Sequence, residues 1–266
     1  MSQIIFDKLH GLGNDYIYID LDKYPLADIA QFARQYSDRR KGIGGDGVIT
    51  YHKQPSGHYM MRIFNLDGSE GLMCGNAIRC VAKLLYERGL DCSNPMTIET
   101  QSGDKILDLM IEGEGVTAAR VDMGLPRVLE VGKRVEEVVG SYVSVGNPHF
   151  IHFIESDPDD YPLAEVGPKV EHDAAFPDGV NYEVAMIQDP NTIKMRVWER
   201  GSGLTQACGT GATATAVAAI NLGLVAHKVK IEMPGGSLVI EWSGKESDPV
   251  YMTGSATYVY QGIVTI

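Results

Sequence analysis

The sequence predicts an α+β protein with mixed or antiparallel sheets, made of two similar halves. Many short β-like runs recur between glycines, while few segments are long enough to be helices, and this balance predicts the α+β class. An internal repeat predicts the two halves. The chain has 266 residues, 44% of them hydrophobic and 22% charged, which is typical of a folded globular protein and excludes disorder over most of the length.

Short runs bounded by turn residues predict the strands. We expect strands at Tyr16–Asp20, Tyr59–Phe64, Met96–Thr100, Lys105–Ile111, Phe150–Ile154, Ile193–Trp198 and Val229–Met233. Longer segments predict helices at Leu26–Ser37, Gly75–Arg88 and Gly209–Leu222. The glycine and proline of Gly124–Pro126 predict a linker between the halves.

The internal repeat is centred on two Cys-Gly motifs. The segment MCGNAIRCVAKLLYERGL contains Cys74, and ACGTGATATAVAAINLGL contains Cys208, which is 208 − 74 = 134 residues later. Each cysteine precedes a helical stretch that ends in Gly-Leu, at Gly89 and Gly223, where a helix favours a residue with positive φ. The matches continue outward in the same order, as in Gly13-Asn14 with Gly146-Asn147, Asn65 with Glu199, and Ile98 with Ile231.

Two equivalent cysteines, each directly before a helix, point to proton-transfer chemistry. The free N–H groups of a helix's first turn and its dipole stabilise negative charge, so we expect both thiols to have a lowered pKa. The same N–H groups can hold a substrate carboxylate. If the halves pack about a pseudo-two-fold axis, the two Cys-Gly turns meet across a cleft. One thiolate would then remove an α-proton while the opposite thiol protonates the other face, which is cofactor-free racemisation or epimerisation.

Other interpretations of these residues fit less well. Free cysteines are usually buried, and we expect Cys80 and Cys92 to be ordinary core residues. A redox pair is disfavoured because the chain has no C-x-x-C motif. His149 and His152 lack the i, i+4 spacing of a helical metal site, so we predict no metal. The segment Gly42–Gly47 lacks the ending and the following helix of a phosphate loop and predicts a structural turn.

The net charge and the hydropathy of the chain limit the kinds of partner and the location that we expect. The net charge is −12, which would repel nucleic-acid phosphates, so we expect no nucleic-acid partner. The longest weakly polar run, Ala212–Ala226, is too short to span a membrane. Asp7, Lys8 and His10 lie where a signal peptide would need an apolar segment, so we expect a cytoplasmic protein with free thiols.

These features together resemble the diaminopimelate epimerase family over essentially the whole chain. The resemblance rests on HGLGND (His10–Asp15), the GIGGDG turn, FNLDGSEGLMCGNAIRC (Phe64–Cys80), GNPH (Gly146–His149), Asn181, ERGSGLTQACGTGA (Glu199–Ala212), EMPGG (Glu232–Gly236) and YMTG (Tyr251–Gly254). It implies two halves, residues 1–119 with the C-terminal strand 256–266 and residues 120–255, each a β-barrel-like sheet around a central helix. It also implies epimerisation of LL-2,6-diaminopimelate to the meso form, without a cofactor, for lysine and peptidoglycan synthesis.

The resemblance also implies a role for each matching residue. Cys74 and Cys208 would be the acid/base groups, and the reacting α-carboxylate would lie on the helix N-termini at Gly75, Asn76, Gly209 and Thr210. The distal ammonium would bind Glu199, and the distal carboxylate would bind Asn65, Asn181 and Arg200. Further site positions are Asn14, Asn147 and His149, and Tyr260 matches a position of a homodimer contact.

The chain departs from the family pattern at three positions. Many members have Gln at the position of Gly47, Gly at that of Ala77 and Glu at that of Leu204, which affects fine specificity. Two alternative functions stay open. One is an epimerase or racemase of proline, hydroxyproline or histidine, although such a one-ended substrate would not need Glu199 and Arg200. The other is a non-catalytic amino-acid-binding protein, although both thiols are retained.

Overall fold

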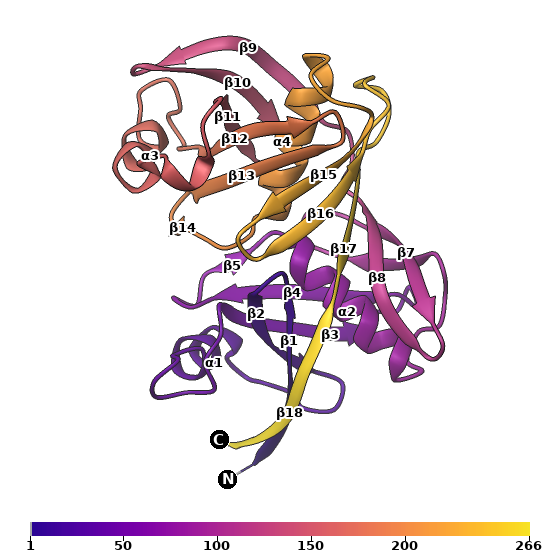
Figure 1. Cartoon of the computed structure of the whole chain (residues 1–266). Helices are drawn as coiled ribbons and strands as arrows, with labels where there is room; N and C mark the ends of the chain where they lie inside the picture. The colour runs from indigo at the N-terminus through magenta and orange to yellow at the C-terminus, as the bar shows by residue number, and fades with distance from the viewer. Residues whose placement is uncertain (1) are drawn as a thin grey trace. The chain divides into compact units, whose positions relative to one another are not determined.

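The computed structural model describes residues 2–266, and the chain divides into two compact units. Unit 1 comprises Met1–Val121 with Gly254–Ile266, and unit 2 comprises Asp122–Thr253. Each unit combines a β-sheet with helices, which confirms the predicted α+β class (Figure 1). Within the described residues, no helix is long and apolar enough to cross a membrane.

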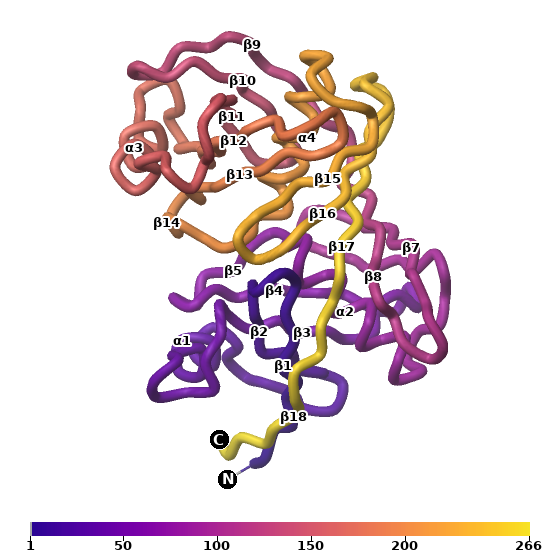
Figure 2. The backbone as a smooth tube through the Cα atoms, in the orientation of Figure 1, coloured from indigo at the N-terminus to yellow at the C-terminus, as the bar shows by residue number. Residues whose placement is uncertain are grey.

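The first strand of unit 1, β1, pairs with its last strand, β18. Its elements are β1 (Gln3–Gly11), β2 (Asn14–Asp20), α1 (Ile29–Tyr36), β3 (Gly47–Lys53), β4 (Tyr59–Asn65), β5 (Glu70–Gly71), α2 (Gly75–Glu87), β6 (Met96–Glu99), β7 (Lys105–Glu112), β8 (Gly115–Asp122, which ends at the unit boundary) and β18 (Thr257–Thr265). The strand order is β18–β1–β2–β3–β4–β6–β7–β8, with β5 on β4. Figure 2 traces β18 back along β1, so the C-terminal strand belongs to the sheet of unit 1.

Unit 2 repeats this arrangement. Its elements are β9 (Arg127–Val135), β10 (Val138–Ser144), β11 (Pro148–Phe153), the short 3-10 helix η1 (Pro158–Asp160), α3 (Leu163–Glu171), β12 (Asn181–Asp189), β13 (Thr192–Glu199), β14 (Gly203–Leu204), α4 (Gly209–Asn221), β15 (Lys228–Met233), β16 (Gly236–Glu241) and β17 (Tyr251–Ser255, which ends across the unit boundary). The strand order is β9–β10–β11–β12–β13–β15–β16–β17, with β14 on β13. Parallel pairs occur at equivalent places, β2–β3 with β11–β12 and β4–β6 with β13–β15.

The side chains of each unit's central helix explain how the strands pack around it. α4 is almost entirely buried and contacts β9 to β13, β15 and β16, so the sheet wraps around it. Its run of alanine, threonine and glycine is small on every face, which lets strands approach from all sides. α2 is amphipathic and contacts β1, β2, β6 and β7. The two expected helices therefore form within one residue of the predicted ends, and Gly89 and Gly223 have φ of 64° and 69°.

The remaining local predictions divide into confirmed and wrong ones. Each of the predicted strands lies on a strand, and Gly42–Gly47 is a turn that leads into β3, not into a helix. α1 begins later than expected, after Asp28, whose carboxylate accepts from the N–H of Gln31. The sequence did not predict α3, because Gly167 and Pro168 lie inside it and are typical helix breakers.

Candidate active site

Cys74 lies at the N-terminus of α2 together with two asparagines. It is the N-cap residue of the helix and is half-buried. Its Sγ donates to Asn14 Oδ1 at 3.6 Å, and Asn76 Nδ2 donates to the same oxygen at 3.3 Å. The first-turn N–H groups of Gly75 and Asn76 have no partner within the helix, which leaves donors suited to an anion. Unit 1 thus brings three predicted site residues together.

A buried arginine holds this cluster from behind. Arg79 is fully buried, and its Nη2 donates to Asn76 Oδ1 at 2.9 Å. Its Nη1 and Nε donate to the carbonyls of Gly75 and Ser255, at 2.9 and 3.1 Å. Burial lowers the pKa of Arg79 from its ordinary value. The sequence analysis missed Arg79, although a charged residue on the apolar face of a helix was a signal that could have found it.

The glycine-rich turn before β3 fixes the other side of the cluster. Asp46 Oδ2 accepts from Asn14 Nδ2 at 2.7 Å, and its Oδ1 pairs with Arg39 at 2.8 Å. Asp15 pairs with Lys8 and Arg39, and these hydrogen bonds lower its pKa even though burial opposes them. The turn therefore positions Asp46 against Asn14, a role that its sequence pattern did not predict.

Asn65 lies at the end of β4. Its Nδ2 donates to Ser69 Oγ at 3.0 Å in the following turn, and the side chain is exposed. It stands opposite Gly47 on β3, which in turn stands opposite Tyr16 on β2. Asn65 therefore belongs to the same row across the sheet as Tyr16, two residues after Asn14.

Cys208 occupies the same position on α4 as Cys74 does on α2, in a different environment. It is the N-cap residue and is buried, and its Sγ accepts from the N–H of Gly211 at 3.4 Å. The Thr210 hydroxyl lies 3.5 Å from this sulfur. Burial raises the pKa of the Cys208 thiol well above its ordinary value, and the nearby carboxylates of Glu199 and Glu183 raise it further. The expected lowering of the pKa is wrong for Cys208, because these effects outweigh the helix N-terminus.

A hydrogen-bonded chain connects Thr210 to the interior of unit 2. Asn147 Nδ2 donates to Thr210 Oγ1 at 3.3 Å, and Asn147 Oδ1 lies 3.0 Å from His149 Nε2. His149 Nδ1 lies 2.6 Å from Glu183 Oε1, and both side chains are fully buried. Three predicted residues, Asn147, His149 and Thr210, thus lie together near Cys208. The sequence analysis missed Glu183, although a glutamate in the apolar strand NYEVAMI was a signal.

Of the residues expected at the distal end of the substrate, Asn181, Glu199 and Arg200 form a second group in unit 2, whereas Asn65 belongs to unit 1. Asn181 uses its amide internally, since Nδ2 donates to the carbonyl of Pro148 at 2.8 Å and Oδ1 accepts from the N–H of Arg200 at 3.0 Å. The exposed Arg200 donates from Nη1 to the carbonyl of Asp178 at 2.9 Å. Glu199 accepts a short hydrogen bond from Thr205, and burial raises the pKa of Glu199.

The remaining cysteines and Tyr260 lie away from these groups. Cys80 is buried as expected, and burial raises its pKa to about 11. Cys92 is exposed, so its prediction as a core residue is wrong; it lies in the loop after α2. Tyr260 is exposed on β18, with its ring edge-on to Phe6 at 6.0 Å between centroids.

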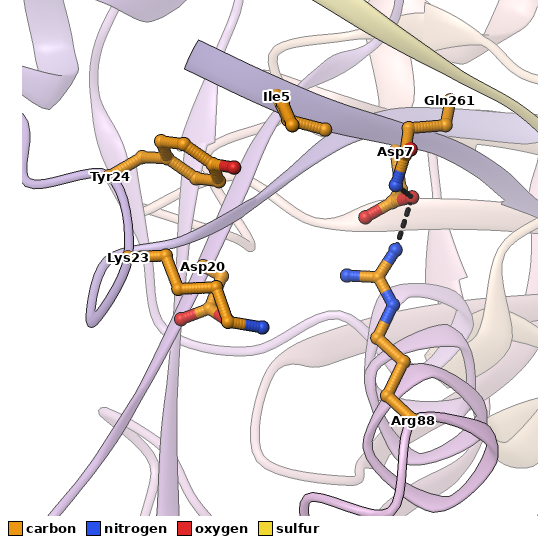
Figure 3. A pocket seen from close by; sticks show the side chains of 7 residues that line it. All are labelled: Ile5, Asp7, Asp20, Lys23, Tyr24, Arg88 and Gln261. Atoms are coloured by element: carbon orange, nitrogen blue, oxygen red, sulfur yellow. Dashed lines mark hydrogen bonds and ion pairs between the residues drawn. The ribbon is translucent and has the colours of Figure 1, made fainter.

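A charged hollow of about 330 Å³ lies elsewhere in unit 1 (Figure 3). It contains no predicted site residue and is lined by Ile5, Asp7, Asp20, Lys23, Tyr24, Arg88 and Gln261. Its four charges are paired, because Arg88 bonds Asp7 and Lys23 lies 3.3 Å from Asp20. In the described part of the chain, no group of three or more His, Cys, Asp or Glu side chains is arranged to hold a metal ion.

Solved structures with the same fold include enzymes of several kinds. The Bacillus anthracis phenazine biosynthesis protein of the PhzF family matches with a TM-score of 0.79 at 17% identity, over 100% of both chains. A hydroxyproline epimerase from Agrobacterium vitis, solved with bound trans-4-hydroxy-L-proline, matches with a TM-score of 0.70 at 14% identity, over 99% of this chain and 91% of that one. At such identities these likenesses support the fold, including its pseudo-symmetric halves.

Sequence relatives define the family. The model of the diaminopimelate epimerase family matches residues 6–129 and 141–259. A diaminopimelate epimerase from Bacteroides thetaiotaomicron is 48% identical over 263 residues, covering 98% of each chain. Another from Parabacteroides distasonis is 45% identical over 269 residues, covering 100% of this chain and 99% of the relative. With both cysteine motifs present and the fold matched throughout, the chain belongs to the diaminopimelate epimerase family.

Proposed function

We propose that this chain is an isomerase that converts LL-2,6-diaminopimelate to meso-diaminopimelate without a cofactor, in lysine and peptidoglycan precursor synthesis. One observation carries the proposal: each of the two repeated units of this family member places a cysteine, Cys74 or Cys208, as the N-cap of its central helix. A single cysteine at a helix start is common, but an equivalent pair is what a two-base inversion requires.

The proposed reaction is a proton exchange at one α-carbon. One thiolate takes the α-proton, so that a C–H bond breaks and an S–H bond forms. The other thiol gives its proton to the opposite face, so that its S–H bond breaks and a new C–H bond forms. The two thiols must therefore reach opposite faces of one carbon. The charge that develops on the substrate is stabilised by first-turn N–H groups at Gly75–Asn76 and Gly209–Thr210.

The distal end of the substrate explains the second group of residues. Diaminopimelate carries an ammonium and a carboxylate that do not react. We assign the ammonium to Glu199 and the carboxylate to Arg200, with Asn65 as a further contact. Because Asn181 accepts from the backbone N–H of Arg200, it supports the distal site by holding Arg200 in place. This pair of opposite charges favours diaminopimelate over proline, hydroxyproline or histidine.

We also propose a cytoplasmic homodimer. The side chains of Tyr258, Val259, Tyr260 and Ile263 are large, apolar or aromatic, and exposed along β18. Such an exposed strip is typical of an interaction surface. Light scattering would test it: the wild type should have twice the chain mass, and Tyr260→Asp should shift it toward the monomer. A wild-type monomer at micromolar concentration would contradict the dimer.

Proton NMR of LL-diaminopimelate with the purified, reduced and EDTA-treated protein in D2O tests the function. We expect loss of one α-proton signal and appearance of the meso isomer without any added cofactor. The same assay with proline, hydroxyproline and histidine tests the alternative substrates. Exchange with one of those and none with diaminopimelate would overturn the proposed substrate. No exchange with any of them would favour a binding protein.

A further inference from the structure

Two side-chain amides beside Cys74 are fixed in orientation by the groups at the two ends of their hydrogen-bonded chain. The Arg79 guanidinium can only donate, so Asn76 turns its Oδ1 to Arg79 Nη2, at 2.9 Å. The Nδ2 of Asn76 therefore faces Asn14 Oδ1, at 3.3 Å, and Asn14 Nδ2 donates to Asp46 Oδ2, at 2.7 Å. Turning either amide over would place two donors or two acceptors against each other. The Asn14 side chain thus presents its oxygen to the Cys74 sulfur.

This orientation suits the protonated form of Cys74 and does not suit the ionised form. The Cys74 thiol donates to Asn14 Oδ1, which lies 3.6 Å from the sulfur. In the proposed reaction the same sulfur loses its proton, and a thiolate can only accept hydrogen bonds. The oxygen of Asn14 has no hydrogen to offer it. The ionised sulfur is therefore stabilised by a donor other than Asn14, as the N–H of Gly211 donates to the sulfur of Cys208 in unit 2.

The Tyr16 hydroxyl is placed to be this donor. Tyr16 lies on β2 two residues after Asn14, so both side chains point to the same face of the strand. Its hydroxyl lies beside Cys74 and Asn14 and forms side-chain hydrogen bonds with both. Burial raises the pKa of Tyr16 well above its ordinary value, and negative charge on Cys74 raises it further. The hydroxyl therefore keeps its proton at and well above neutral pH and remains able to donate.

Gly47 provides the space in which the Tyr16 ring lies. Gly47 stands opposite Tyr16 on β3 and opposite Asn65 on β4. A Cβ at Gly47 would lie 2.2 Å from the carbonyl oxygen of Phe64 and 3.2 Å from the Tyr16 ring. The backbone and the ring together exclude a side chain at position 47. The departure from the family pattern at Gly47 and the tyrosine at position 16 are therefore two parts of one arrangement.

We propose that Tyr16 is a further catalytic residue of unit 1: its hydroxyl donates to the Cys74 sulfur when that sulfur is ionised, and Asn14 accepts the thiol hydrogen when it is not. The hydroxyl only rotates about its C–O bond, and no covalent bond to it forms or breaks. The role rests on the proposed function, but the contact itself can be tested without substrate. The titratable and charged groups around Cys74 are Tyr16 and Tyr18 on β2, Arg79 and Cys80 on α2, and Asp46 beyond Asn14.

The first test compares Tyr16→Phe with the wild type by alkylation of Cys74. The rate of iodoacetamide labelling is followed against pH, and peptide mass spectrometry distinguishes Cys74 from Cys208. Phenylalanine keeps the ring over Gly47 and removes only the hydroxyl. We expect the labelling midpoint of Cys74 to move upward by about one pH unit, because the thiolate loses a donor, and that of Cys208 to stay unchanged. A lowered or unchanged midpoint at Cys74, or an equal shift at both cysteines, overturns the proposal.

Tyr18→Phe is the matched control. Tyr18 lies on the same face of β2, two residues after Tyr16, and its fully buried hydroxyl lies beside Cys80. The same substitution there should leave the labelling midpoint of Cys74 unchanged. A shift as large as that of Tyr16→Phe would show that the loss of any hydroxyl from this strand has the effect, which would overturn the assignment to Tyr16.

A measurement on the wild type keeps the test independent of folding defects in the variant. In carbon NMR of protein labelled at the Cζ of tyrosine, the signal of Tyr16 should show a small step at the pH of the Cys74 labelling midpoint. The step is expected because the hydroxyl changes its hydrogen-bond partner there without losing its proton. A signal that does not change at this pH would overturn the proposal.

Epimerisation kinetics give the functional consequence. We expect Tyr16→Phe to lower kcat about tenfold and to leave KM within about twofold, since the hydroxyl contacts the reacting sulfur and not the groups that bind the distal end. A raised KM with an unchanged kcat would show that Tyr16 serves substrate binding instead and would overturn the proposal. If the wild type shows no epimerisation, the proposed function fails, while labelling and NMR still decide whether Tyr16 donates to Cys74.

Discussion

The N-termini of α2 and α4 are related by the repeat, yet they surround their cysteines with different chemistry. The Cys74 thiol donates a hydrogen bond to Asn14, and the side chain of Arg79 is buried in the interior behind it. Cys208 instead accepts from the N–H of Gly211, caps its own helix, and has carboxylates in the interior behind it. The two sites share the same backbone arrangement, but the charged side chains behind them differ: an arginine in unit 1 and glutamates in unit 2.

The surroundings of Cys208 affect the acidity of its thiol. Near Cys208, burial and two carboxylates disfavour the thiolate, so the thiol is retained to higher pH. Near Cys74, the buried guanidinium of Arg79 favours negative charge. A two-base inversion needs one thiolate and one thiol at the same time. In the proposed mechanism, the raised pKa of Cys208 would suit the thiol that holds its proton.

Removing either thiol should have the largest effect. We expect Cys74→Ala and Cys208→Ala each to lower the epimerisation rate about 10³-fold, because each face of the carbon loses its proton carrier. Coupled assays of meso product formation would measure this. Cys80→Ala is the matched control, since Cys80 is buried in α2 away from its first turn. Near-normal turnover by either thiol variant would contradict the requirement for both thiols.

Substitutions at equivalent helix positions compare the interiors of the two units. Arg79→Met leaves buried acceptors on Gly75, Asn76 and Ser255 without their donor, and we expect a loss of about 3 kcal/mol in the free energy of unfolding. Thr213 stands 134 residues later and bonds the carbonyl of Gly209 at 2.8 Å. Its isosteric change to Val should cost only about 1 kcal/mol. Urea denaturation measures both, and equal losses would contradict a special role for Arg79.

The pH dependence should reveal the raised pKa of Cys208. The proposed mechanism requires the protonated thiol of Cys208, so kcat/KM should fall on the alkaline side only above the pKa of an ordinary thiol, about 8.5. The sign follows from burial and the carboxylates, which keep the proton on sulfur as pH rises. An alkaline limb below that value would show that the environment of Cys208 does not retain the proton.

Cys92 should give the smallest effect. Its exposed side chain lies in a loop, and Cys92→Ser should change the free energy of unfolding by less than about 0.5 kcal/mol and leave activity unchanged. Thermal unfolding and the epimerisation assay check both statements. A large loss would mean that Cys92 has a partner that its exposure does not suggest.

The sequence predicted what depends on local pattern and on repetition. Both central helices, their glycine ends and the equivalent cysteines followed from motifs that recur in order. α3 was missed because breaking residues lie inside it, and its packing against Trp198 is long-range: a Cβ on Gly167 would lie 2.5 Å from that ring.

The chemistry behind the thiols could not be predicted for the same reason. Glu183 reaches His149 only because β12 pairs with β11 in parallel, and Asp46 reaches Asn14 only across a turn. The acid strength of Cys208 depends on burial and on carboxylates from two strands, whereas its helix position alone suggested the opposite shift. Sequence reasoning thus located the two cysteines at the helix starts but not the charged side chains around them.

The most direct test of the two-thiol account is the fate of deuterium at the start of the reaction. LL-diaminopimelate would be incubated with enzyme in D2O, and both isomers would be analysed by NMR and mass spectrometry while less than about a tenth is converted. With two different thiols, the meso product should carry deuterium at the inverted carbon and the remaining LL substrate should carry none. Deuterium appearing equally in substrate and product would show one base serving both faces, which would contradict the account.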